Sequence, residues 1–117
     1  MPLITLEYTK NIKHHPEFAK TFQHLHELVV STLEAKLASC KSWAVKLDDY
    51  YIADGSEPKR AFVQVTIAIL TGRDLAKRER LSQTCLEYLQ AIYPSAEQKI
   101  DIAVEIREIE RATYSQN

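Results

Sequence analysis

The chain repeats one order of structural patterns, strand, helix and strand, and this repetition constrains its fold more than any other feature. Alternating apolar residues predict the strands, and apolar residues three and four apart predict the helices. A strand, a helix and a second strand in one sheet form a parallel crossover unit. The expected elements are a strand at 2–8, a helix from 16 to about 38, a strand at 42–52, a strand at 61–70, a helix between 74 and 93, and a strand at 102–110.

Local signals support these elements. Pro16 and Glu17 begin the first helix in a favoured way, with proline in the first turn and an acid near the positive end of the helix dipole. Asp74 is a good N-cap for the second helix. The first helix has an apolar stripe, and so does the second; the first stripe consists of Phe18, Phe22, Leu25, Val29, Leu33 and Leu37.

The resulting prediction is a single α+β domain over 1–117, with two similar halves at about 2–55 and 60–110. The duplicated β-α-β units form a four-stranded mixed sheet, and the two helices cover one face of it. The strands place apolar residues such as Leu3 and Phe62 on the other face as well. We therefore expect other subunits of the same protein to cover that face, although a monomer with a half-polar face is the common alternative.

Composition excludes several classes of protein. The net charge of -1 provides no electrostatic footprint for nucleic acid or an anionic membrane. No apolar run reaches the roughly 20 residues of a membrane helix, and nothing before the first strand resembles a signal peptide. Cys40 and Cys85 lack a metal-binding spacing and indicate reduced thiols, and His24 and His26 point apart on one helix. We expect a cytoplasmic protein without metal or cofactor.

The chain begins with Met1-Pro2, and removal of the initiator Met would leave Pro2 with a secondary amine. An α-amino group has a pKa near roughly 8, and both burial and a nearby cation lower it. A strand that carries this amine into an apolar pocket beside Lys or Arg would hold a neutral base at pH 7. Pro2 alone favours an ordinary N-terminal strand whose second residue is proline.

Arg73 is the other residue whose position suggests chemistry. It follows Gly72, one of only two glycines, at the junction between a strand and a helix. Such junctions commonly carry ligand-binding groups. The neighbouring cations Lys77, Arg78 and Arg80 indicate a solvated helix face, and a surface position for Arg73 is an equal alternative.

An ordered set of short segments adds to these observations. They are Pro2 after Met1, Asn11-Ile12, 53–55, 61–63, 65–67, Gly72-Arg73 and 104–109. Together they make the chain resemble the 5-carboxymethyl-2-hydroxymuconate Δ-isomerase family of the tautomerase superfamily over nearly its whole length.

This resemblance implies a homotrimer with active sites near subunit boundaries and Pro2 as the catalytic base. It implies isomerisation of a dienol dicarboxylic acid like 5-carboxymethyl-2-hydroxymuconate in the breakdown of aromatic compounds. Arg73 falls on one carboxylate-binding position. Lys41 stands on the other, where the family has Arg. Lysine keeps the charge but lacks the planar fork of arginine, which leaves the exact substrate open.

Three alternatives remain. The chain is compatible with another proline-dependent enzyme of the superfamily, such as a tautomerase, decarboxylase or hydratase. It is also compatible with a catalytically silent trimer that binds a small ligand. Two β-α-β halves also occur in ferredoxin-like interaction domains, in which Pro2 would have no role.

Overall fold

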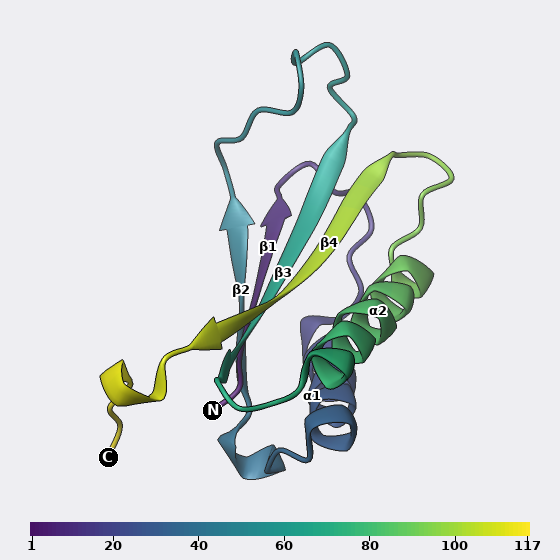
Figure 1. Cartoon of the computed structure of the whole chain (residues 1–117). Coiled ribbons are helices and arrows are strands. Elements are labelled where there is room, and N and C mark those ends of the chain that lie inside the picture. Colours follow the sequence, from purple (N-terminus) through teal and green to yellow (C-terminus); the bar gives the residue numbers. More distant parts are fainter.

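The computed structural model describes residues 1–117 as two layers, a four-stranded sheet and a pair of helices packed on one of its faces (Figure 1). The order of elements repeats as the sequence predicts. The elements are β1 (Leu3–Thr9), α1 (Phe18–Leu33), β2 (Lys41–Leu47), β3 (Ala61–Leu70), α2 (Leu75–Ile92) and β4 (Ile100–Ile109), with short 3-10 helices at Leu37–Ser39 and Arg111–Thr113.

The strand order is β2-β1-β3-β4, and it confirms the predicted duplication. Strand β1 pairs in parallel with β2, and β3 pairs in parallel with β4. The two units meet through the antiparallel pair β1 and β3, in which Ile4 lies opposite Ile67 and Leu6 lies opposite Val65. The fold is therefore the α+β class with a mixed sheet.

The hydrophobic core lies between the sheet and the helices. Alternate residues of β1 and β3, including Ile4, Leu6 and Ile67, are fully buried there. Leu25 of α1 and Leu89 of α2 are fully buried as well. Each such side chain contributes about 1.5 to 3 kcal/mol by leaving water. The alternation predicted for the strands is confirmed, because it selects which residues face the helices.

Several predicted boundaries were wrong. The first helix begins at Phe18 and not at residue 16, so Pro16 precedes its first turn. The first helix ends at Leu33 and not near residue 38, because Glu34 adopts a left-handed backbone conformation with φ of 57°. Leu37 consequently leaves the apolar stripe and is 60% exposed. The second strand ends at Leu47 and not at 52, and a long loop with Gly55 at φ of 75° leads to β3.

The face of the sheet away from the helices is partly apolar and has no layer over it. Trp43 and Val45 of β2 lie on this face, beside Thr5 and Glu7 of β1. Trp43 is 44% exposed and Val45 is 36% exposed. Phe62 of β3 points to the same side and is half-buried. An indole and a valine left in water on a sheet face favour a covering partner.

The end of the chain extends beyond the body of the domain. Strand β4 pairs with β3 up to its last residue, Ile109, and the chain then leads into the 3-10 helix Arg111–Thr113, which projects sideways (Figure 1). This arm contributes to the elongated shape of 44 × 26 × 26 Å. Neither helix combines the length and the apolar character that crossing a membrane requires.

Candidate active site

Pro2 lies at the edge of the core, where β1 begins. It is buried, and its carbonyl oxygen accepts a hydrogen bond from the Lys41 backbone N–H at 3.1 Å. The Met1 amine, one residue earlier, donates to the Ser39 carbonyl oxygen at 2.9 Å. The parallel pairing of β1 with β2 therefore holds the start of the chain against the residues that open β2, and it brings Pro2 and Lys41 together.

The electrostatic surroundings of this amine favour its neutral form. Partial burial lowers the pKa of the Met1 amine, and the positive charge of Lys41 lowers it further. The Cys40 side chain acts in the opposite direction on that pKa. Burial raises the pKa of the Cys40 thiol, so this group is uncharged near pH 7 and its opposing effect is small. Processing of Met1 would transfer the amine to Pro2, which is more deeply buried.

Arg73 lies at the same end of the sheet. Leu3 pairs with Ala68, and from there the chain continues past the end of β3 to Gly72 and Arg73. Gly72 has a φ of 127°, a conformation that favours glycine, and it turns the chain toward α2. The Arg73 Nε donates to the Leu33 carbonyl oxygen at 3.4 Å, which joins this turn to the end of α1.

Two cations at this end, Arg73 and Lys41, have no acidic partner, whereas neighbouring cations do. Arg78, Arg107 and Arg60 each form an ion pair, with Glu108, Glu105 and Asp101. Arg73 and Lys41 form no ion pair with any carboxylate. Cations left unpaired beside a buried amine suit the recognition of an anionic ligand.

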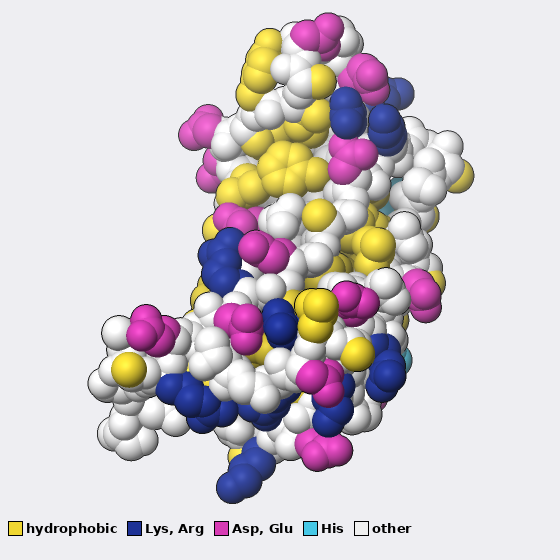
Figure 2. Space-filling model, in the orientation of Figure 1, with side chains coloured by type: hydrophobic (Ala, Val, Ile, Leu, Met, Phe, Trp, Pro, Cys, Tyr) yellow, Lys and Arg dark blue, Asp and Glu magenta, His cyan; other side chains and the backbone are white.

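One cation here, Arg111, was not singled out in the sequence, where the last expected strand ends at residue 110. The Arg111 Nε donates to the Thr71 carbonyl oxygen at 2.8 Å, across 40 residues of sequence. No local pattern marks Arg111, because its neighbours in the chain are ordinary polar residues. Lys and Arg side chains, interleaved with acids, gather over the part of the surface near the C-terminal arm (Figure 2).

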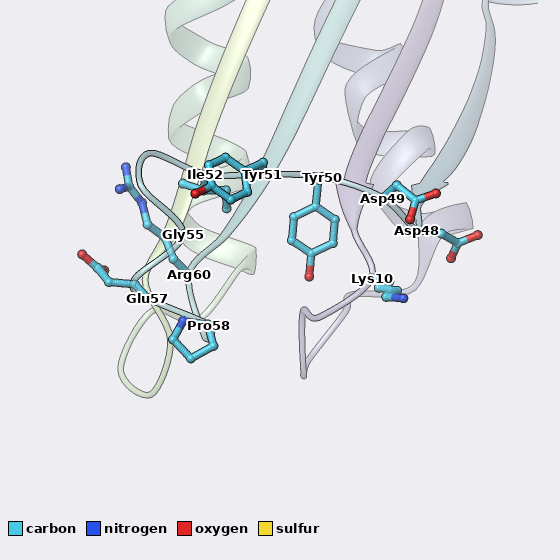
Figure 3. Close-up of a pocket in the computed structure, with 10 residues that line it drawn as sticks. All are labelled: Lys10, Asp48, Asp49, Tyr50, Tyr51, Ile52, Gly55, Glu57, Pro58 and Arg60. Carbon is cyan, nitrogen blue, oxygen red and sulfur yellow. The ribbon is translucent and has the colours of Figure 1, made fainter.

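The largest cavity lies elsewhere. Its volume is about 420 Å³, and it is formed by Lys10, after β1, and by the loop between β2 and β3. Figure 3 shows the Tyr50 hydroxyl directed into this space between Lys10 and Pro58. Its cations are balanced by Asp48, Asp49 and Glu57, and Arg60 is bound to Asp101. Pro2, Lys41 and Arg73 do not line it, and its mixed charge is poorly suited to an anion.

Other polar residues lie outside the candidate site, and the histidines among them make specific contacts. Asp48 and Asp49 are exposed and lie in the loop after β2. His26 Nε2 lies 3.0 Å from Ser42 Oγ, and His24 stacks on Tyr88 with ring centroids 4.0 Å apart. His15 is half-buried among aromatic rings.

The two joined β-α-β units, with a buried proline at the start of the first strand, place the chain in the tautomerase fold class. The family model of 5-carboxymethyl-2-hydroxymuconate isomerase matches residues 2–117, and the chain belongs to this family. The predicted resemblance is confirmed. Family and fold support an isomerase or tautomerase. A comparison with curated proteins gave no match.

Solved structures agree with this fold. A 5-carboxymethyl-2-hydroxymuconate isomerase from Deinococcus radiodurans R1 matches with a TM-score of 0.90 and 25% identity, over 99% of this chain and 88% of that one. A 5-carboxymethyl-2-hydroxymuconate delta-isomerase matches with a TM-score of 0.80 and 16% identity, over 100% and 87%. A fused 4-OT symmetric trimer matches with a TM-score of 0.75 and 20% identity, over 98% and 91%.

Proposed function

We propose that this protein isomerises a dienol polycarboxylate of the 5-carboxymethyl-2-hydroxymuconate type, with the Pro2 amine as general base and acid. The observation that carries the proposal is the environment of the chain's amino end. Burial and Lys41 both lower the pKa of the Met1 amine there. The amine that Pro2 carries after removal of Met1 would meet the same two influences, which favour a neutral base near pH 7. The family description names the reaction type and the compound.

The mechanism moves one proton along the substrate. Neutral Pro2 accepts the proton of the enol hydroxyl, and the electron pair of that O–H bond forms the ketone C=O. The double bonds shift, and the Pro2 ammonium returns the proton to the carbon at the end of the dienol. One group therefore acts first as base and then as acid. Arg73 and Lys41 bind carboxylates and stabilise the negative charge of the intermediate dienolate.

The substrate class needs one correction on chemical grounds. The named compound carries two carboxylates on its muconate skeleton and a third on its carboxymethyl branch, so it is a tricarboxylate. The dicarboxylic acid expected from the sequence undercounts these anions. Arg73 and Lys41 account for two of them.

We propose a homotrimer as the functional assembly, in the cytoplasm and in the catabolism of aromatic compounds. The exposed Trp43 and Val45 on the open sheet face support an assembly that covers this face. The fused 4-OT neighbour is described as a trimer and has the same fold. A site completed by neighbouring subunits also explains why the single chain has no large cavity at Pro2.

The test is ultraviolet-monitored turnover of 5-carboxymethyl-2-hydroxymuconate by protein whose mass confirms a free Pro2. We expect Pro2→Ala to lose about 100-fold or more in kcat/KM, within the usual contribution of a positioned acid-base group. Native mass spectrometry on the same samples reports whether both proteins are trimers.

Two outcomes would contradict the proposal. Equal turnover by Pro2→Ala would remove Pro2 as the base. Absence of turnover in a trimer with free Pro2 would retain the fold and require a different substrate or a binding role.

A further inference from the structure

The segment after β4 places a further guanidinium at the Pro2 end of the sheet. The Thr71 backbone N–H donates to the Ile109 carbonyl oxygen at 3.1 Å, and the Arg111 Nε donates back to the Thr71 carbonyl oxygen at 2.8 Å. These two bonds close the C-terminal arm onto the junction between β3 and α2. Arg111 is thereby fixed beside the turn that carries Arg73.

The Arg111 side chain packs against Gly72. A Cβ at Gly72 would meet the Arg111 Nη2 at 3.5 Å and the Nε at 3.9 Å, so the guanidinium lies directly over this residue. The next residue in the chain is Arg73. The guanidinium groups of Arg111 and Arg73 therefore flank one short junction, Arg111 over Gly72 and Arg73 reaching toward Leu33.

Arg111 and Arg73 are held in the same way. Each donates its Nε to a backbone carbonyl oxygen, and neither forms an ion pair with a carboxylate. In contrast, a terminal nitrogen of Arg60, Arg78 and Arg107 contacts an acidic side chain. An arginine whose Nε is fixed by the backbone presents its two terminal nitrogens as a fork, which matches the two oxygens of a carboxylate.

We propose that Arg111 is a third carboxylate-binding residue and that it selects substrates with a third carboxylate. This inference rests on the proposed function, in which Arg73 and Lys41 bind the other two. Lys41 replaces a forked arginine with a point charge, and Arg111 supplies a second fork at the same end. The carboxymethyl branch is the group that Arg111 binds.

The first experiment compares 5-carboxymethyl-2-hydroxymuconate with 2-hydroxymuconate, which lacks the branch. For Arg111→Gln, we expect KM for the branched substrate to rise about 10- to 100-fold, the range for loss of a hydrogen bond between charged groups. We expect kcat to change little and KM for the unbranched substrate to stay within about twofold. Arg111→Lys should fall between Gln and the natural residue, because it keeps the charge without the fork.

Arg80→Gln is the matched control. Arg80 is exposed on α2 and, like Arg111, forms no ion pair with a carboxylate, so we expect its removal to leave both KM values unchanged. Arg111 also holds the Thr71 carbonyl, and a purely structural role would raise KM for both substrates equally. Equal effects on the two substrates, or no effect on either, would overturn the inference.

A binding measurement separates this inference from the proposed function. Isothermal calorimetry compares propane-1,2,3-tricarboxylate with glutarate, which lacks the middle carboxylate. We expect the tricarboxylate to bind more tightly and Arg111→Gln to abolish this preference. That result in a protein without turnover would retain Arg111 as an anion-binding residue and reject the isomerase. Equal preference in the natural protein and the variant would overturn the inference whatever the turnover.

Discussion

The two β-α-β units have the same architecture, but they differ in charge balance at the start of their first strands. At the start of β1, the buried Pro2 lies beside Lys41, which has no acidic partner. At the start of β3, the Ala61 backbone N–H donates to the Lys99 carbonyl oxygen at 3.0 Å. Arg60 there contacts Asp101 through both its Nε and its Nη2, each at 2.9 Å.

This difference indicates which of two similarly packed units can form a binding site. Both units bury the same kind of strand under the same kind of helix, so packing alone does not distinguish them. Only the first unit carries the Met1 α-amine, whose pKa is lowered by burial and by Lys41. The second unit neutralises Arg60 with Asp101, whereas the first leaves Lys41 without an acidic partner.

The largest loss of turnover should follow from an added residue that converts the Pro2 amine into an amide. A Leu inserted between Met1 and Pro2 makes the Pro2 nitrogen an amide, which has no basicity. We expect turnover to fall about 100- to 10,000-fold, the contribution of a general acid-base group. The melting temperature and the oligomeric state seen by native mass spectrometry should stay unchanged, and an extended protein with full turnover would refute the role of Pro2.

The cores of the two units should be equally sensitive to cavities. Leu25→Ala in α1 and Leu89→Ala in α2 each remove a fully buried side chain. We expect each to lower the free energy of unfolding by about 2 to 5 kcal/mol in urea titrations. Leu37→Ala, at a residue that is 60% exposed, is the control and should change it by less than about 0.5 kcal/mol.

The two helices should differ at their N-termini. Asp74 accepts a hydrogen bond from the Lys77 N–H at 2.8 Å, whereas Glu17 makes no side-chain capping bond. Asp74→Ala should therefore lower stability by about 1 kcal/mol. Glu17→Ala should change it by less than about 0.5 kcal/mol. Similar losses in both variants would show that the cap of α2 has no special role.

The ion pair at the start of β3 should matter little for catalysis. Asp101→Asn weakens the pair with Arg60, whose partners are partly exposed to solvent. We expect stability to fall by about 0.2 to 1 kcal/mol and turnover to stay unchanged. A large loss of turnover would show that the two ends of the sheet are not functionally distinct.

The two ends should also respond differently to pH. Burial lowers the pKa of His15 from 6.5, and its Nε2 is buried without a hydrogen-bond partner. The unfolded chain therefore binds more protons, so stability should fall as pH drops below about 6.5 and level off below the lowered pKa of the folded protein. Burial lowers the pKa of His26 as well. The free energy of unfolding, measured against pH in His15→Phe and in His26→Phe, separates the contributions of the two histidines to this loss of stability.

At the Pro2 end, the lowered amine pKa should appear in activity. The base is the neutral amine, so kcat/KM should rise with pH, and the midpoint of this rise should lie below pH 8.0, the ordinary pKa of an α-amine. Removing the charge in Lys41→Gln should move this limb to higher pH. An unchanged pH profile of kcat/KM would show that Lys41 does not affect the pKa of the amine.

Local patterns predicted much of the fold. The alternation of Val63, Val65, Ile67 and Ile69 predicted β3 with its observed bounds, because a strand with one buried face must alternate. Asp74 predicted the start of α2. The end of α1 was not predictable, since apolar spacing continues to Leu37 while the backbone of Glu34 turns left-handed. That turn is required to bring the chain back to β2.

The sequence by itself determined the duplicated order of elements, the buried face of each strand and the place of Pro2 at the start of the first. These follow from residue spacing, which each segment carries within itself. Only the tertiary structure decided that Lys41 lies beside Pro2 and that Arg111 lies over Gly72. Strand pairing brings these residues together from 40 or so positions apart, and no local periodicity encodes such a contact.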